Sequence, residues 1–166
     1  MSVIASVLSK ICYAIADQTS QIIGNVAGTD VVGKIGNPRD AVPESNTSQL
    51  NFFYYRFEPS AFNADVLPGE THFWRVFSLV TPFGVEELDA GISAGENDLR
   101  ILGEIIRVFQ ERPVFSIEVD DEVYQIQAVV MPLEVEQLSQ LWGTQGDVVY
   151  RPSIAYEMAV VPVTPN

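Results

Sequence analysis

The segment Thr71–Thr81 (THFWRVFSLVT) limits how this chain can fold more than any other segment. Apolar residues occupy both of its alternating faces, and Pro82 and Gly84 follow directly. A strand that is apolar on both faces needs cover on both faces, which is typical of a central strand. The chain therefore has to supply a sheet and further elements that cover it.

Three other segments have the alternation of strands. Leu50–Phe57 (LNFFYYRF) is rich in aromatic residues, and Val123–Met131 alternates between apolar and polar side chains. Tyr150–Val163 forms the last predicted strand, with Pro152 and Pro162 near its ends. Because proline has no N–H to donate, we expect at least part of this strand to lie at a sheet edge.

Three segments have helical periodicity. Residues 2–23 repeat apolar side chains at steps of three and four, and Gly24 supplies a stop for this helix. Further helices are predicted around Leu99–Phe109 and over Leu133–Trp142. Residues 24–49, rich in Gly, Pro and Ser, are interpreted as a long loop, either a contact arm or a disordered excursion.

The mixed order of helices and strands predicts one α+β domain over residues 1–166. We expect a four- or five-stranded mixed sheet, with an N-terminal helix, a central helix and a short C-terminal helix packed on it. A chain of 166 residues with 47% hydrophobic content can bury one sizeable core.

The net charge of −13 disfavours nucleic acid and anionic membranes as partners, because both are bound mainly through cationic side chains. A polar or basic protein partner fits better, and a solubility coat is the alternative interpretation. The lone cysteine, Cys12, cannot form an internal disulfide, which fits synthesis in the cytoplasm. The apolar run Val3–Ala16 is too short to span a bilayer, so we expect no direct membrane insertion.

Residues suited to catalysis or metal binding are scarce. The only histidine, His72, lies in a predicted strand, and no serine lies in a G-x-S-x-G motif. One His and one Cys cannot supply the four ligands of a structural zinc site, and the acidic run Asp120–Glu122 lacks the spacing of a calcium loop. We therefore predict no catalytic residue, no metal and no cofactor, and we expect the chain not to be an enzyme.

Two segments carry a resemblance to a known family. Asp98–Phe115 (DLRILGEIIRVFQERPVF) is similar to the central helix of that family, and Leu133–Val163 is similar to its C-terminal signature. The signature positions are Leu138, Leu141, Trp142, Tyr150, Arg151, Ser153 and Tyr156. On these residues the chain resembles the tail-terminator, or cap, family of phage-tail-like contractile injection systems.

This resemblance implies a structural subunit that forms a hexameric ring and ends the inner tube and the sheath. The implied partners are further copies of the chain, the inner tube protein and the sheath protein, within an assembled particle that is either released or membrane-anchored.

The scarce cations and the final strand are the candidate contacts in such a ring, because an exposed strand edge can be extended by a neighbour. The candidate interface residues are Asn37, Arg39, Arg56, Arg75, Arg151, Met158 and Val160. The alternative is a soluble ligand-binding or enzymatic α+β domain, with a pocket lined by Tyr54, Tyr55, His72 and Trp74.

Overall fold

The computed structural model describes residues 7–27, 30–41, 46–60 and 67–163. Within them the chain forms three α-helices, six strands and two short 3-10 helices. In chain order the elements are α1 (Val7–Ala27), β1 (Val31–Ile35), η1 (Pro38–Asp40), β2 (Ser48–Pro59), β3 (His72–Phe83), η3 (Leu88–Ala90), α2 (Ala94–Glu111), β4 (Val114–Val119), β5 (Glu122–Met131), α3 (Val135–Gly143) and β6 (Ile154–Val163).

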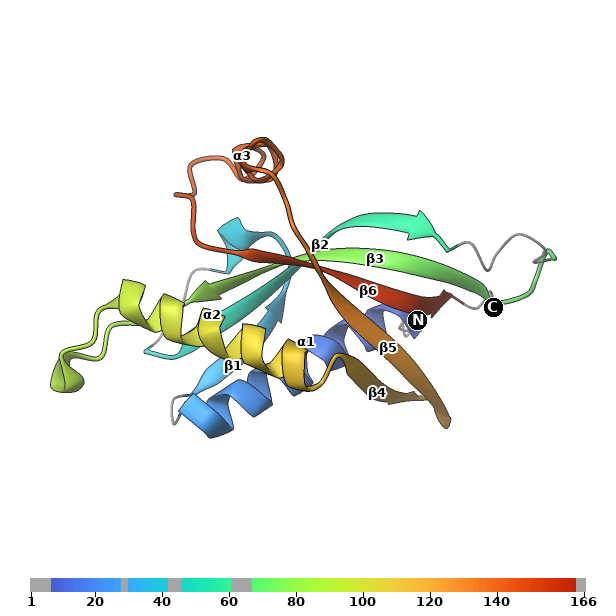
Figure 1. Ribbon diagram of the computed structural model, residues 1–166, viewed down its shortest axis with the longest axis horizontal. Helices are drawn as coiled ribbons and strands as arrows, with labels where there is room; N and C mark the ends of the chain where they lie inside the picture. The colour runs from blue at the N-terminus through green and yellow to red at the C-terminus, as the bar shows by residue number, and fades with distance from the viewer. Residues whose placement is uncertain (1–6, 28–29, 42–45, 61–66, 164–166) are drawn as a thin grey trace, which may run out of the picture.

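The strands form one mixed sheet in the order β1-β2-β3-β6-β5-β4 (Figure 1). β1 runs parallel to β2, and every other neighbouring pair is antiparallel. β3, the strand that is apolar on both faces, lies between β2 and β6, and its residues 76–83 are all buried. The predicted central position of this strand is therefore confirmed.

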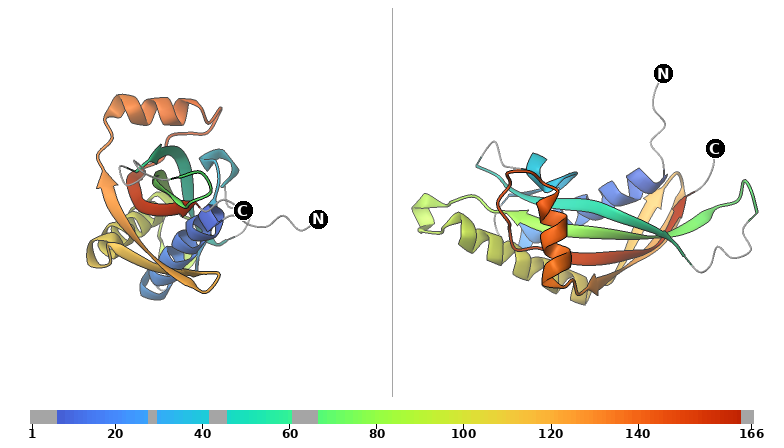
Figure 2. Two further views of the ribbon diagram at one scale, coloured as in Figure 1. Left: turned by 90° about the vertical axis from the view of Figure 1, so that its right-hand side faces the viewer. Right: turned by 90° about the horizontal axis from the view of Figure 1, so that it is seen from above.

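Helices cover both faces of the sheet. α1 and α2 pack on one face, and α3 lies across the other (Figures 1 and 2). The main core joins Ile15 of α1 and Ile105 of α2 to inward side chains of the sheet such as Val80. A smaller core beneath α3 joins Trp142 to Leu79. The α+β class predicted from the sequence is confirmed.

α1 buries the apolar face that its periodicity predicts, including Ile11 and Ile15, which are fully buried. Gly33 of β1 lies against this helix. A Cβ at Gly33 would lie 2.8 Å from the Ala16 carbonyl oxygen and 2.7 Å from Ser20 Oγ, so the glycine lets β1 approach the helix backbone closely.

The interpretation of residues 24–49 as one long loop is wrong. α1 continues through Gly24 to Ala27, and β1 and η1 follow within the same stretch. β1 has only five residues, and its pairing with β2 and its packing on α1 stabilise it as a strand. These contacts have no counterpart in a short-range sequence pattern. Residues 28–29 and 42–45 of this stretch lie outside the described part of the chain.

The sheet has six strands where four or five were expected, because β1 and β4 both belong to it. The expected edge position of the final strand also needs correction, since β6 lies between β3 and β5. Pro152 precedes β6, and β6 pairs with β3 as far as Val163 but with β5 only as far as Ala159. Pro162 therefore lies where β6 has one neighbouring strand, so its missing N–H interrupts no second ladder.

All three predicted helices are present. The N-terminal helix, expected over residues 2–23, is described from Val7, since residues 1–6 lie outside the described part. α2 begins after Ser93, whose hydroxyl oxygen accepts the Glu96 backbone N–H at 3.2 Å. α3 spans Val135–Gly143, close to the predicted helix Leu133–Trp142.

Candidate interaction surfaces

Arg56 and Arg75 meet on the sheet face that α3 partly covers. In the strand register Arg75 lies opposite Glu58, and Arg56 lies opposite Phe77. Arg75 donates to Glu157 through Nε at 2.5 Å and Nη2 at 3.0 Å, and to Glu58 through Nη1 at 3.2 Å. Arg56 also pairs with Glu58. We call Arg56, Glu58, Arg75 and Glu157 the arginine cluster.

The ring of Phe77 forms the floor of the arginine cluster. The guanidinium carbons of Arg56 and Arg75 lie 5.1 and 5.3 Å from the ring centroid, within the range of a cation–π contact. The hydrogen bonds from Arg75 lower the pKa of the Glu157 carboxyl. The same hydrogen bonds raise the pKa of Arg75, so both groups stay charged near neutral pH. The cluster is a fixed, electrically balanced patch on an acidic protein.

A groove runs beside the arginine cluster, between the sheet and α3. Its volume is about 400 Å³, and Tyr55, Arg56, Leu133, Gln137 and Leu141 contribute to its lining. Both apolar and polar side chains line this groove, a mixture common in protein–protein contacts.

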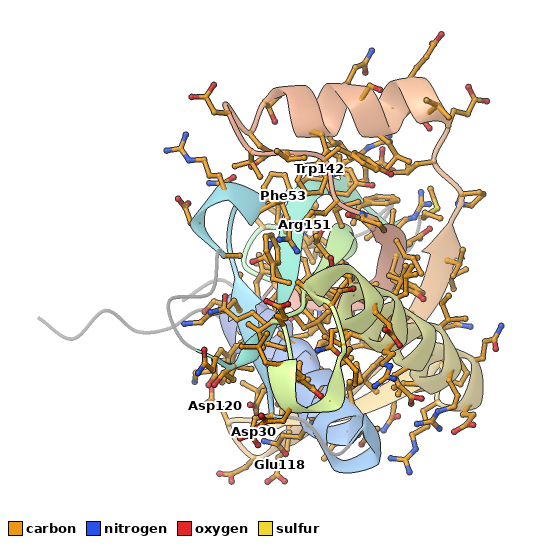
Figure 3. The ribbon with its side chains drawn as sticks, turned by 90° about the vertical axis from the view of Figure 1, so that its left-hand side faces the viewer. Asp30, Phe53, Glu118, Asp120, Trp142 and Arg151 are labelled. Atoms are coloured by element: carbon orange, nitrogen blue, oxygen red, sulfur yellow. The ribbon has the colours of Figure 1, made fainter. Side chains whose placement is uncertain are left out.

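Arg151 links three separate parts of the chain. Its Nη1 lies 3.2 Å from Asp98 Oδ2 on α2, and its guanidinium lies over the Phe83 ring, 4.5 Å from the centroid. Asp98 also accepts the Gly84 backbone N–H at 2.6 Å. Burial raises the pKa of Asp98, although the Gly84 N–H and Arg151 act in the opposite direction. Figure 3 shows Arg151 below α3, between that helix and the rest of the molecule. In this subunit Arg151 therefore acts as an internal link.

A projecting acidic segment, Val85–Ile92, connects β3 to α2 and lies at one end of the molecule (Figure 1). Asn97, which is buried, donates to the Val85 carbonyl at 2.6 Å and to Glu87 Oε1 at 3.3 Å. At the tip, the side chain of Leu88 is 79% exposed. The segment is therefore an ordered projection with an apolar tip.

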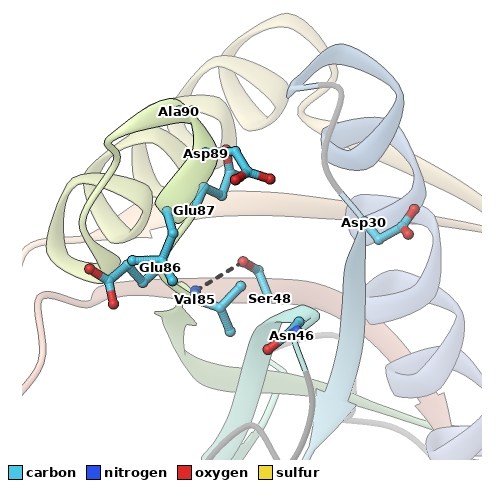
Figure 4. Close-up of a pocket in the computed structure, with 9 residues that line it drawn as sticks. Asp30, Asn46, Ser48, Val85, Glu86, Glu87, Asp89 and Ala90 are labelled. Carbon is cyan, nitrogen blue, oxygen red and sulfur yellow. Dashed lines mark hydrogen bonds between the residues drawn. The ribbon is translucent and has the colours of Figure 1, made fainter.

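This acidic segment borders a hollow of about 590 Å³ (Figure 4). Ser48 also lines this hollow and accepts the Val85 backbone N–H at 3.2 Å. The acidic side chains around the hollow are Asp30, Glu86, Glu87 and Asp89, and none of the lining residues that the structure describes is Lys or Arg. Sequence reasoning missed this surface, although the close spacing of Glu86, Glu87 and Asp89 was a visible signal.

The remaining candidate interface residues lie apart from the arginine cluster. Asn37 and Arg39 are exposed around η1, where Arg39 Nε lies 3.5 Å from Asp40 Oδ1. Met158 was expected at an interface, but its side chain is fully buried because it faces the main core beneath α1 and α2. Val160 lies in β6, and the position of its side chain is outside the described structure.

The groups with catalytic potential lie in separate places. Cys12 is buried, and burial raises the pKa of its thiol to about 11, so the thiol stays protonated at neutral pH. His72 is the first residue of β3. Among the described residues no group of three or more His, Cys, Asp or Glu side chains could hold a metal ion. No described helix is both long and apolar enough to cross a membrane.

The pocket of the alternative ligand-binding hypothesis is not assembled as expected. Tyr54 packs against the main core and donates its hydroxyl to the Cys12 carbonyl at 3.0 Å, whereas Tyr55 packs against the smaller core on the opposite face. Trp74 also packs on the main core, so Tyr55 lies on the other face of the sheet from Tyr54 and Trp74, and the three cannot line one pocket.

Two solved structures resemble this fold. The first is the sheath/tube terminator of PVC, an extracellular contractile injection system, in its extended state. It matches at a TM-score of 0.61 and 13% identity, over 95% of this chain and 56% of that chain. The second is the tube-terminating cap of the anti-feeding prophage, at a TM-score of 0.48 and 17% identity, over 77% of this chain and 51% of that chain.

The first match shows a shared fold, and this chain spans about half the length of both structures. A comparison with curated proteins gives no match. Residues 15–166, nearly the whole chain, match the Pvc16 N-terminal domain family. The resemblance to tail terminators seen in the sequence is thereby confirmed, and the chain belongs to the Pvc16 N-terminal domain family.

Proposed function

We propose that this chain is a structural cap subunit that ends the inner tube and the sheath of a contractile injection system as a hexameric ring. It acts by complementary binding, without turnover. It is synthesised in the cytoplasm and becomes part of the assembled particle. Its partners are further copies of itself, the inner tube protein and the sheath protein.

The match of residues 15–166 to the Pvc16 N-terminal domain family carries this proposal. The shared fold with a protein described as a sheath/tube terminator supports it. The charge of −13 adds a physical reason, since an acidic subunit favours basic protein surfaces over nucleic acid.

The exposed candidate residues supply the proposed contacts with tube and sheath. Asn37 and Arg39 lie together around η1, and Arg56 and Arg75 lie together over Phe77. Arginine is enriched at the centres of protein interfaces because its planar guanidinium forms several directed hydrogen bonds. Arg39, with a side chain that is 59% exposed, is the freest of these to bind a partner.

Tube assembly in the presence of the purified chain tests the proposal. The chain is added to polymerising inner tube protein, tube lengths are measured by electron microscopy, and sheath binding is measured by co-sedimentation. We expect shorter tubes, each ending in a ring of this chain. Arg39→Glu should reduce tube or sheath binding by about 5- to 50-fold, the range of one interface arginine.

Arg100→Glu is the matched control, because Arg100 is exposed on α2 and, within the described residues, pairs only with Glu96 one helical turn away. It changes the net charge by the same amount and should leave tube lengths unchanged. A chain that stays monomeric, leaves tube length unaltered and binds neither tube nor sheath would refute the cap function.

A further inference from the structure

The sheet has two outer strands, β1 and β4. Neither pairs with a further strand among the described residues, so each has one edge of free backbone N–H and C=O groups. Apolar side chains are exposed beside both edges: Val32 and Ile35 of β1 at 44% and 45%, and Val114 of β4 at 48%. Both edges can therefore be extended by another strand.

The two outer strands have the same sense within the sheet. β1 is parallel to β2, and the four antiparallel pairings that lead from β2 through β3, β6 and β5 to β4 restore that direction. A neighbour that continues the sheet, with the same face turned to the core, therefore presents β4 parallel to β1. Contacts between two different surfaces of identical subunits close into a ring when the rotation permits.

The two cations that form no ion pair within the described residues lie at these same strands. Every Lys and Arg side chain except Lys34 and Arg112 forms an ion pair with another described residue. Lys34 lies near the end of β1, and Arg112 lies two residues before β4 begins. Asp30, just before β1, and Glu118, near the end of β4, are exposed and form no ion pair within the described residues.

These four charges are complementary in a parallel alignment. Asp30 and Lys34 have the same separation along the chain as Val114 and Glu118. When Lys34 lies opposite Glu118 of a neighbour, Asp30 therefore lies opposite Val114, within reach of the long side chain of Arg112.

Lys34 and Glu118 also lie on the same face of the sheet, away from the core. Gly33 faces α1, so the adjacent Lys34 points to the other side of the sheet. Phe115 and Ile117 of β4 point into the main core, so Glu118 also points away from it. Joining the two strands therefore continues one apolar face and places Lys34 and Glu118 together on the opposite face.

We propose that copies of this chain join head to tail, with β1 of one copy pairing in parallel with β4 of the next, through Lys34–Glu118 and Asp30–Arg112 ion pairs. This inference rests on the ring of the proposed function and adds the contact that builds it. An edge lysine usually discourages strand pairing. Here a partner that offers Glu118 turns the same lysine into a selective contact.

Charge exchange tests the contact. Lys34→Glu and Glu118→Lys, made singly, place like charges opposite each other and should weaken subunit association by on the order of tenfold. The double variant restores opposite charges, so it should recover most of the wild-type association. Association is measured by analytical ultracentrifugation and by ring counts in electron micrographs. Arg100→Glu, which matches the charge change of Lys34→Glu away from both edges, should associate like the wild type.

Cysteine cross-linking tests the same contact and its register. Neighbouring strands bring Cβ atoms within disulfide range, so Lys34→Cys combined with Glu118→Cys should give a ladder of covalent oligomers on oxidation. Lys34→Cys combined with Ser116→Cys tests a register shifted by two residues. Each single-cysteine variant, with the buried Cys12 retained, should give no ladder.

The outcomes separate this inference from the proposed function. The β1–β4 contact would be overturned if rings form, neither cysteine pair gives a ladder, and the charge-exchange variants associate like the wild type. The cap function would remain intact in that case. If the chain is monomeric in solution but binds tubes, the cross-linking is carried out on the tube-bound chain. The absence of a ladder under those conditions also overturns the contact. A chain that neither associates nor binds tube or sheath overturns the cap function itself.

Discussion

At the scale of single residues, Gly33 lets β1 pack closely against α1. A Cβ at this position would lie 2.8 Å from the Ala16 carbonyl oxygen, which is backbone and cannot move aside alone. We expect Gly33→Ala to lower the free energy of unfolding by about 1–3 kcal/mol through overpacking. Chemical denaturation with urea measures this change.

Gly103 is the matched control for Gly33. It lies in α2, is exposed, and a Cβ there would meet nothing within 4 Å. Because alanine favours helix over glycine, Gly103→Ala should raise the free energy of unfolding by about 0.5–1 kcal/mol. Equal effects at both positions would contradict the close approach of β1 to α1.

Glu157 makes the stability contributed by the arginine cluster depend on pH. Hydrogen bonds from Arg75 lower the pKa of Glu157 below its ordinary value of 4.5. A carboxyl with a lower pKa in the folded chain stabilises the fold fully above its ordinary pKa, and this contribution is lost as the pH falls through the lowered value. We therefore expect Glu157→Gln to lower the thermal midpoint at pH 7, and this difference to shrink below about pH 4.

Thermal denaturation followed by circular dichroism at pH 7 and at lower pH checks this expectation. Glu86→Gln is the control, since Glu86 is exposed and forms no ion pair among the described residues. Its midpoint should stay close to that of the wild type at both pH values. A Glu157→Gln difference that grows toward acid pH would exclude the stabilising role of the Arg75–Glu157 pair.

At the scale of elements, the sequence predicts best where the pattern is long. The apolar residues of α2 repeat at helical spacing, so its type could be predicted from the sequence. Its start, after Ser93, lies before the segment Leu99–Phe109 that carries this repeat. β1 is short and contains Gly33, and it is a strand because of contacts with β2 and α1. Such contacts depend on the folded arrangement, which is why the sequence alone predicts a loop here.

The candidate contact residues show the same limit. Arg56 and Arg75 could be selected as rare cations, but their meeting over Phe77 depends on the register of β2 against β3. Met158 was selected from alternation alone, which does not say which face of β6 meets the main core. A register irregularity between Trp74 and Val76 of β3 also changes the alignment with β6.

α3 is the element whose packing is easiest to isolate, because it covers a face with its own small core. Trp142 is 5% exposed and packs with side chains that include Phe53, near which it lies in Figure 3. We expect Trp142→Ala to lower the free energy of unfolding by about 3–5 kcal/mol. Amide hydrogen exchange should become faster in α3 than in α1 and α2, because α3 loses its own core contact. Hydrogen exchange with mass spectrometry resolves the three helices.

Val135→Ala is the control within the same helix, because the side chain of Val135 is 78% exposed. Exchange rates in α3 should then remain close to those of the wild type. If Trp142→Ala accelerates exchange equally in all three helices, α3 is not a separate unit of stability.

At the scale of the whole molecule, the fold class followed from the sequence but the strand order did not. The two kinds of periodicity and the strand that is apolar on both faces were enough to predict helices on a sheet. The placement of β6 between β3 and β5 is decided by which strands bury each other's apolar faces. Prolines near its ends suggested an edge, yet only its last residues have a single neighbouring strand.

The net charge of −13 decides how salt affects assembly. Two compact chains of this size lie about 40 Å apart when in contact. Their repulsion is then about 5 kcal/mol at 0.01 M salt, where the Debye length is about 30 Å, and about 0.1 kcal/mol at 0.15 M, where it is about 8 Å. The exposed ion pairs proposed between β1 and β4 contribute only about 0.2–1 kcal/mol each, so repulsion dominates at low salt.

We therefore expect ring formation to strengthen as salt rises from 0.01 to 0.15 M. An interface governed by ion pairs would instead weaken over this range, because salt screens the pairs. Sedimentation of the wild type across this range measures the effect. Above 0.15 M the remaining repulsion is small, so the charge-exchange variants should then differ from the wild type mainly through the ion pairs themselves. Association that weakens steadily from 0.01 M upward would mean that local ion pairs outweigh the repulsion between whole subunits.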